Sequence, residues 1–149
     1  MIVGLISDTH GLLRDEAVAA LRGSDLIIHA GDVGGGDVLD RLRALATLFA
    51  VRGNIDQGAP CSNLPESAVV QVAEWRIYVL HDIHALGLDP GGSGFRAVVS
   101  GHSHKPAVAE KNGVLYINPG SAGRRRFRLP VTVALLEVPA WNVRFIDLA

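Results

Sequence analysis

Acidic and imidazole side chains follow the first apolar segment of this chain directly. Residues 1–6 are short, apolar and β-branched, and the run stops at Ser7-Asp8-Thr9-His10-Gly11. Successive side chains of a strand point to opposite faces, so Asp8 and His10 share one direction if the extended geometry continues past the strand. A carboxylate beside an imidazole is suited to metal binding. Taken alone, the segment is equally compatible with Asp8 capping a following helix and His10 lying in a loop.

The same pattern, an apolar run followed by polar residues, recurs further along the chain. The later clusters are Gly31-Asp32, Gly53-Asn54, His81 and Gly101-His102-Ser103-His104. Together with the first cluster they supply seven oxygen and nitrogen donors, too many for one tetrahedral zinc ion. They suit two metal ions that share a bridging carboxylate and lie roughly 3.5–4 Å apart. Imidazole, carboxylate and amide ligands together favour manganese, iron, zinc, cobalt or nickel over calcium.

Each of these residues has a simpler explanation when it is considered alone. Asp32 could be a turn former after a glycine, Asn54 a left-handed turn residue, and residues 101–104 a polar loop. A fold that needed only turns, however, has no reason to place four histidines and two aspartates at strand ends. The combination therefore favours a metal site.

The elements that carry the clusters alternate in the first third of the chain. Apolar runs predict strands at residues 1–6, 25–30 and 47–51. Apolar spacing predicts helices at residues 13–21 and 38–46, the second capped by Asp37. This β-α-β-α-β order implies parallel strands with right-handed crossovers. In such sheets, ligands bind beyond the carboxyl ends of the strands, which is where the clusters lie.

The remaining two thirds favour strands over helices. We predict strands at residues 67–72, 76–81, 97–100, 107–110, 114–117, 131–138 and 142–148. Asn112-Gly113 is a strong signal for a two-residue hairpin turn, and residues 85–94 are rich in glycine and favour a loop. We therefore expect two packed sheets with helices on an outer face.

Composition indicates an ordinary globular chain. We expect residues 1–149 to form a single domain, since single domains commonly run to roughly 100–200 residues. The net charge of −1 gives no general attraction to nucleic acid or anionic membrane, and we find no nucleic-acid-binding motif. Apolar runs are too short to span a membrane, and the lone Cys61 suits a reducing compartment. We expect a cytoplasmic protein, and the sequence leaves a homo-oligomer open.

The order Asp-x-His, Gly-Asp, Gly-Asn, His, Gly-His-x-His resembles the calcineurin-like metallophosphoesterase superfamily, in particular its small single-domain bacterial and archaeal phosphodiesterases. The resemblance covers essentially the whole chain and includes Asn118-Pro119-Gly120-Ser121. It implies an α/β fold: a four-layer sandwich of two mixed β-sheets packed face to face, with helices on the outside. It also implies a centre for two metal ions at the strand ends.

The resemblance assigns a role to each candidate residue. Asp8, His10 and His104 would hold one metal, Asn54, His81 and His102 the other, and Asp32 would bridge both. The expected catalytic residues are Asp32, Asn54 and His10. The expected cofactors are two divalent ions per chain, manganese first, with iron, zinc, cobalt or nickel as alternatives. A hydroxide between the ions would attack the phosphorus of a small phosphodiester or phosphomonoester.

The chain departs from the family pattern at two places. Many members carry His-Gly-His where this chain has His81-Asp82-Ile83, with His84 outside that register. Larger relatives place a histidine after Gly-Asn, where it can protonate the leaving group, and this chain has Ile55 instead. The first departure leaves the contribution of Asp82 and His84 open, and the second limits the chemistry.

Three further features carry weaker interpretations. His29 lies inside a strand and fits a hydrogen-bonded histidine behind the ligands better than a ligand. Gly34-Gly35-Gly36 lacks the spacing of a nucleotide-binding loop and indicates a close approach of backbone. The arginines Arg124, Arg125, Arg126 and Arg128 could contact substrate phosphate or a partner, or form a solvated basic patch.

A second function remains open. The small subunit of the retromer complex shares this fold and serves mainly as a binding surface, so a protein-interaction scaffold is the rival to an enzyme. An intact set of seven donors favours catalysis.

Overall fold

The computed structural model describes residues 1–148, and its strands form two mixed five-stranded sheets. The first sheet has the order β10-β9-β1-β2-β3. Its strands are β1 (Ile2–Ile6), β2 (Leu26–His29), β3 (Thr47–Ala50), β9 (Thr132–Glu137) and β10 (Asn142–Asp147). β1, β2 and β3 are parallel, as the alternating sequence pattern predicts, and β9 pairs antiparallel with both β1 and β10.

The second sheet has the order β4-β5-β6-β8-β7. Its strands are β4 (Ser67–Val72), β5 (Trp75–Leu80), β6 (Ala97–Val99), β7 (Ala107–Lys111) and β8 (Val114–Asn118). The three central strands are parallel and both outer pairs are antiparallel. Asn112 and Gly113 have φ of 52° and 78°, the pair of left-handed residues that a tight hairpin turn needs, so the predicted hairpin is confirmed.

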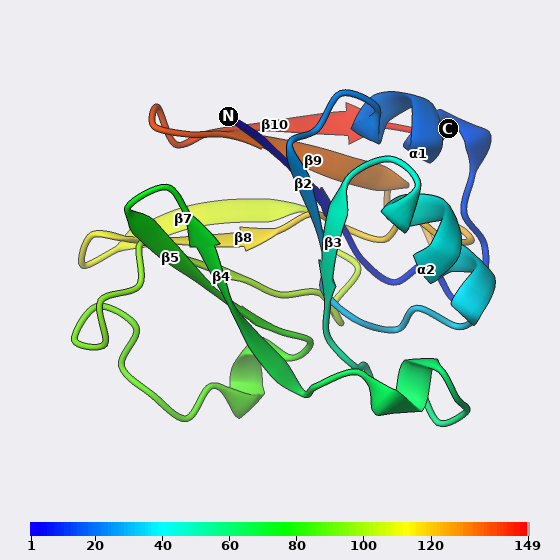
Figure 1. Ribbon diagram of the computed structural model, residues 1–149, viewed down its shortest axis with the longest axis horizontal. Helices are drawn as coiled ribbons and strands as arrows, with labels where there is room; N and C mark the ends of the chain where they lie inside the picture. Colours follow the sequence, from blue (N-terminus) through cyan, green and yellow to red (C-terminus); the bar gives the residue numbers. More distant parts are fainter. Residues whose placement is uncertain (149) are drawn as a thin grey trace.

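Helices α1 (Asp15–Leu21) and α2 (Gly36–Arg43) cover the outer face of the first sheet (Figure 1). Their buried side chains, Leu21 and Leu39 among them, share one apolar cluster with Ile27 of β2. Residue Gly35 precedes α2 without any side-chain cap, so the prediction that Asp37 caps this helix is wrong. Asp37 lies within the first turn, where its charge favours the positive end of the helix dipole.

The main core lies between the two sheets. Alternate residues of β1 and β2, such as Leu5 and Ile28, face Val79 and Val99 of the second sheet, and all are fully buried. Burial of each such side chain stabilises the fold by about 1.5–3 kcal/mol. This core fixes the two sheets face to face, with the carboxyl ends of β1, β2, β3, β5 and β6 at a shared edge.

The outer face of the second sheet carries no α-helix among the described residues. Leu80 and Val98 on this face pack against Ile83 and Leu86, which belong to the segment after β5 and its short 3-10 turn η2 (Ile83–Ala85). A second 3-10 turn, η1 (Cys61–Asn63), precedes β4. The expected sandwich is present, and its fourth layer is reduced to a turn and loops. No helix within residues 1–148 is long and apolar enough to cross a membrane.

Candidate metal centre

All seven candidate ligands lie in the segments that follow five strands. Asp8 and His10 follow β1, and Asp32 and Asn54 follow β2 and β3. The second sheet supplies the remaining three, His81 after β5 and His102 and His104 after β6. Short distances join them into one continuous cluster. The parallel core of each sheet therefore delivers donors to the same place.

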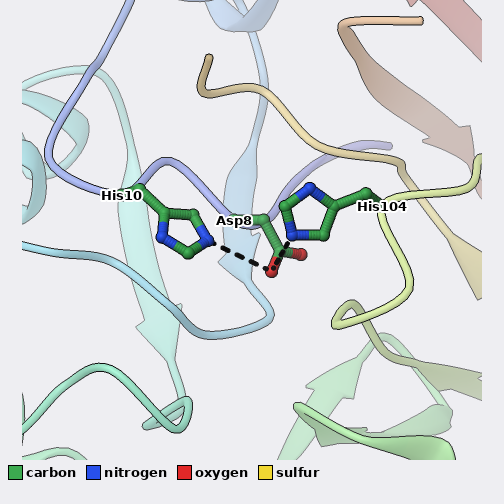
Figure 2. Close-up of side chains that lie close together, drawn as sticks. All are labelled: Asp8, His10 and His104. Atoms are coloured by element: carbon green, nitrogen blue, oxygen red, sulfur yellow. Dashed lines mark ion pairs between the residues drawn. The ribbon is translucent and has the colours of Figure 1, made fainter. Parts of the chain in front are cut away.

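The first group consists of Asp8, His10 and His104 (Figure 2). Asp8 Oδ1 lies 3.3 Å from His104 Nε2 and 3.8 Å from His10 Nε2. The other Asp8 oxygen, Oδ2, accepts hydrogen bonds from Ser7 Oγ at 2.7 Å and from the His102 N–H at 3.1 Å. Asp8 thus uses one oxygen to hold its position and presents the other to the two imidazoles.

The second group is centred on Asp32 and His81. Asp32 Oδ2 lies 3.3 Å from His81 Nε2, and His102 Nδ1 lies 3.3 Å from the same nitrogen. His81 Nδ1 lies 2.8 Å from the carbonyl oxygen of Ala30. A carbonyl only accepts, so Nδ1 carries a proton. Without metal, a second proton on Nε2 can donate to Asp32, and its loss would leave Nε2 free to bind a metal.

Several lone pairs of the cluster face one another with no hydrogen between them. Asp8 Oδ1 and His10 Nε2 are buried without a hydrogen-bond partner. One end of the Asn54 side-chain amide lies 3.1 Å from His81 Nε2 and 3.2 Å from Asp32 Oδ1: its NH2 would donate to these atoms without metal, and its oxygen would face a bound cation. Facing lone pairs repel, and a cation between them turns the repulsion into attraction. The residues therefore fit the metal ions that their types imply.

The arrangement leaves Asp8 and Asp32 as two candidates for a shared ligand. By distance, Asp8 belongs to two groups of potential ligands. One group is Asp8 with His10 and His104, and the other is Asp8 with Asp32 and His81. Asp32 Oδ2, however, lies 3.5 Å from His10 Nε2 and 3.3 Å from His81 Nε2, so it stands between an imidazole of each set. Asp8 Oδ1 lies closer to His104 than to His81, at 3.3 Å and 3.9 Å.

Five candidate ligands have left-handed backbone. They are Asp8, His10, Asp32, His102 and His104, with φ between 48° and 69°. Non-glycine residues in this region cost of order 1–3 kcal/mol each and gather at functional sites. The expectation that Asp8 and His10 converge through continued extended geometry is therefore wrong, although they do converge. Asn54 is not among these residues, which removes its explanation as a left-handed turn residue.

The glycine before each ligand of the Gly-x type makes room for another ligand. A Cβ on Gly53 would overlap with the Asp32 carboxylate, and a Cβ on Gly101 would overlap with Ser7 Oγ and lie 2.6 Å from Asp8 Oδ2. The glycine therefore brings neighbouring strand ends close enough for their side chains to meet. Gly34 likewise has no room for a Cβ against His10 and Gly11, which confirms the predicted close approach.

Comparison with known proteins gives the family. A model of the calcineurin-like phosphoesterase superfamily domain matches residues 1–140. The chain belongs to this superfamily. A probable metallophosphoesterase of Methanothermobacter thermautotrophicus is 30% identical over 150 residues, covering 91% of this chain and 85% of the relative.

Two solved structures show the same fold at low identity. An archaeal phosphodiesterase has a TM-score of 0.85 at 23% identity, with 99% of this chain and 100% of that chain covered. A Vps29 from Entamoeba histolytica, complexed with zinc, has a TM-score of 0.75 at 22% identity, with 100% of both chains covered. One fold therefore accommodates both kinds of relative.

The acidity of the phosphoesterase centre is set by competition between burial and hydrogen bonds. Burial favours the neutral form of Asp32, but hydrogen bonds from His81 and from the Ile55 N–H outweigh it and bring its pKa to about 2. Burial raises the pKa of Asp8 and lowers the pKa of His10 and His104. Hydrogen bonds to Asp32 and Ala30 outweigh burial at His81 and raise the pKa of this histidine. Two buried carboxylates, with His10 and His104 favouring their neutral forms, make a locally electronegative cavity suited to cations.

One buried carboxylate of the phosphoesterase site was not singled out from the sequence. Asp56 accepts hydrogen bonds from the N–H groups of Val33, Gly34 and Gly53, at 3.1, 3.0 and 2.9 Å. It thereby joins the loops that carry Asp32 and Asn54. Its position three residues after Gly53, in a polar cluster at a strand end, is a signal that could have marked it as an organising residue.

His29 is a support behind the ligands, as predicted. It is fully buried, and its Nδ1 accepts the Gly31 N–H at 3.1 Å. Thr9 Oγ donates to the carbonyl oxygen of Val33, so the 3.0 Å contact between Thr9 Oγ and His29 Nε2 requires the ring to donate from Nε2. Burial lowers the pKa of His29 to about 4, which keeps this neutral form in place.

A cavity of about 700 Å³ opens beside the second group. Asn54, His81 and His102 line it together with Arg52 and Tyr78. Asp82 also lines it, with Oδ2 at 3.9 Å from His102 Nε2, whereas the His84 side chain is 90% exposed and contacts Asp82. The geometry therefore favours His81 over His84 as the ligand from this segment.

Proposed function

We propose that this chain is a dimetal phosphodiesterase. Asp8, His10 and His104 would hold one divalent ion, Asn54, His81 and His102 would hold the other, and Asp32 would be shared by both. Manganese is the proposed physiological ion. The observation that carries the proposal is the pair of buried atoms Asp8 Oδ1 and His10 Nε2, which face each other without a hydrogen-bond partner, since such repulsion persists only where a cation relieves it.

The residues of the chain have distinct tasks in this proposal. Two divalent ions would supply a water nucleophile at neutral pH and neutralise charge on the phosphoryl oxygens. Asn54 and His102 are exposed at the rim, so the ester approaches from their side, through the cavity lined by Tyr78 and Arg52. His10 Nε2 lies 3.5 Å from Asp32 Oδ2, so it would help to hold the ion of the first group next to this oxygen.

A diester is the favoured substrate class because hollows flank both groups. The cavity beside Asn54 and His102 can take one ester substituent. A second hollow is lined by Ser103 and Lys105, the two neighbours of His104, and can take the other. A phosphomonoester would use only one of them.

The test is hydrolysis of bis-p-nitrophenyl phosphate by metal-stripped protein supplied in turn with manganese, iron, zinc, cobalt and nickel. We expect turnover that requires added metal, and faster turnover of the diester than of p-nitrophenyl phosphate. Asp32→Ala should bind less metal and lose turnover, while Asp40→Ala, an exposed carboxylate on α2, should behave as wild type. Near-normal activity of Asp32→Ala with two ions bound would contradict the bridging role.

The same experiment decides the rival function. A scaffold of the Vps29 kind would fold and even bind metal, yet hydrolyse neither ester under any of the five ions. Absence of turnover with two ions bound per chain would therefore favour the scaffold. Turnover that follows metal occupancy would favour the enzyme.

A further inference from the structure

A strongly basic segment follows residues that are hydrogen-bonded to the candidate centre. We call residues 124–128, Arg-Arg-Arg-Phe-Arg, the basic loop. The residues before it are fastened to the first ligand turn: Ser121 Oγ donates to the Asp8 carbonyl oxygen at 3.1 Å, and Ala122 N–H donates to the Ser7 carbonyl oxygen at 3.0 Å. Arg14 holds the Gly123 carbonyl oxygen. The basic loop therefore begins directly beside the turn that carries Asp8 and His10.

The charges of the basic loop have no ion-pair partner within the described part of the chain. Among residues 1–148, no carboxylate lies within ion-pair distance of Arg124, Arg125, Arg126, Arg128 or the nearby Lys105. Arg126 is close enough to His10 and His104 to lower the pKa of both, after burial. The near-neutral net charge of the chain thus conceals a local concentration of cations next to a centre that would bind phosphate.

An aromatic side chain stands in the middle of these cations. Phe127 is 93% exposed, the most exposed large apolar side chain of the described residues, and its φ of 54° is left-handed. It lines the hollow beside His104 together with Ser103, Lys105, Arg128 and Leu129. A phenylalanine in this position stabilises nothing by packing, so its ring is free to meet a ligand.

We propose that the basic loop is a nucleotide subsite, in which the arginines and Lys105 bind a phosphate next to the scissile diester and Phe127 stacks on a base. The substrate class is then a short single-stranded oligonucleotide. Cations that follow a phosphate backbone beside an exposed aromatic ring are the pattern by which proteins bind single strands. An inorganic or lipid phosphate would use the arginines and leave the ring without a role. The proposal rests on the proposed phosphodiesterase function.

Binding rather than turnover provides the test. The probe is a short fluorescein-labelled oligothymidylate with phosphorothioate linkages that resist hydrolysis, titrated with the metal-loaded full chain and followed by fluorescence anisotropy. Phe127→Ala should weaken binding about tenfold, within the range for loss of one base stack. The control Val108→Ala, which truncates another exposed apolar side chain on β7, should leave affinity unchanged.

The salt dependence of oligonucleotide binding tests whether the arginines contact phosphates. Removal of one phosphate contact lowers the slope of log affinity against log salt by about 0.7 for a single strand. Arg125→Gln should show this change, and Arg22→Gln, which alters an exposed arginine at the end of α1, should not.

Turnover gives a further test of Phe127. In Phe127→Ala, the rate of hydrolysis of unmodified oligothymidylate, relative to that of bis-p-nitrophenyl phosphate, should fall about tenfold, in proportion to the lost stack.

Distinct outcomes would overturn the subsite and the enzyme separately. Absence of binding, equal weakening by Arg22→Gln and Arg125→Gln, or an unchanged affinity of Phe127→Ala would each overturn the subsite. Full displacement of the probe by tripolyphosphate or polyglutamate at equal charge would do so too, since it shows a simple anion patch. Binding that depends on Phe127 in a protein that hydrolyses no ester would retain the subsite and contradict the enzyme.

Discussion

Each inner ligand of the candidate centre is anchored through one atom and left free at another. Asp8 is held through Oδ2 by Ser7, Asp32 through Oδ1 by the Ile55 N–H, and His81 through Nδ1 by Ala30. The free atoms are those that face the middle of the cluster. Such anchoring lowers the entropy lost when a metal binds, since the side chains are already oriented.

The neighbouring histidines His81 and His84 provide a matched test of ligand assignment. His81→Ala should lower metal content at one site and reduce kcat/KM strongly, because its Nε2 faces the centre, 3.3 Å from Asp32 Oδ2. His84→Ala should have a mild effect, because its side chain is 90% exposed and contacts only Asp82 within the cluster. Metal analysis and kinetics of both variants are the measurement. The reverse ranking would show that His84 is the ligand.

A second residue, Ile55, limits the chemistry of the site. A positioned general acid typically contributes about 10²–10⁴-fold when the leaving group is poor. Ile55 is 40% exposed beside the centre and offers no proton, and burial lowers the pKa of His10, which disfavours its protonated form. We therefore expect aryl diesters to react well and unactivated alkyl phosphates slowly.

The measurement for Ile55 is a leaving-group series of phosphodiesters, with log kcat/KM plotted against leaving-group pKa. Wild type should give a steep line, Ile55→His a shallower one, and Ile55→Leu, which matches the volume, the wild-type slope. A flat wild-type line under conditions where chemistry limits the rate would show that another side chain already donates the proton.

At the scale of elements, loops after neighbouring strands are tied together by buried polar side chains. His29 on β2 contacts the turn after β1 through Thr9 and its own following turn through the Gly31 N–H. Asp56 joins the turns after β2 and β3. The left-handed backbone of the ligands is therefore held by hydrogen bonds from outside the ligand set, which offset its strain.

The buried His29 predicts how the metal-free protein responds to acid. Its pKa falls from 6.5 to about 4 on folding, so the unfolded chain binds the proton more tightly. Its contribution to stability is full above pH 6.5 and is lost as the pH falls from 6.5 toward 4, by up to about 3 kcal/mol. Urea unfolding at pH 7.5 and at pH 5, with a chelator present, measures the loss.

The control is His29→Asn, which keeps an acceptor for the Gly31 N–H but does not titrate in this range. This variant should be less stable at neutral pH, because it leaves space behind Thr9, and should lose less stability on acidification than wild type. An equal loss in both proteins would assign the acid sensitivity to other groups.

Elements were easier to predict from the sequence than the geometry at their ends. Apolar periodicity and Asn112-Gly113 report short-range preferences, so the strands and the hairpin could be predicted to within a few residues. The left-handed conformations of Asp8 and Asp32 depend on hydrogen bonds between distant loops, which no local pattern encodes. The same holds for the missing cap at Asp37 and for the role of Asp56.

At the scale of the whole molecule, the candidate centre lies across the seam between the two sheets. Four of its residues follow strands of the first sheet and three follow strands of the second. Direct hydrogen bonds already cross this seam, from His81 to Ala30 and from the His102 N–H to Asp8. Metal ions would add further links between the sheets and relieve the repulsion of Asp8 and Asp32.

Metal binding should therefore stabilise the entire fold. Saturation at roughly 100–1,000 times the dissociation constant contributes about 3–4 kcal/mol to folding, since the unfolded chain has no assembled site. For a chain of this size, roughly 2–4 °C of Tm corresponds to each kcal/mol, so we expect a rise of roughly 10 °C when manganese replaces a chelator. Differential scanning calorimetry of the stripped and reloaded protein is the measurement.

The rise in Tm should be much smaller in His81→Ala, which removes a link from the second sheet. It should equal that of the wild type in His84→Ala, which alters a residue three positions further along the same segment. An equal rise in both variants would show that the stabilising ion binds outside the seam, and the assignment of the centre to both sheets would then be wrong.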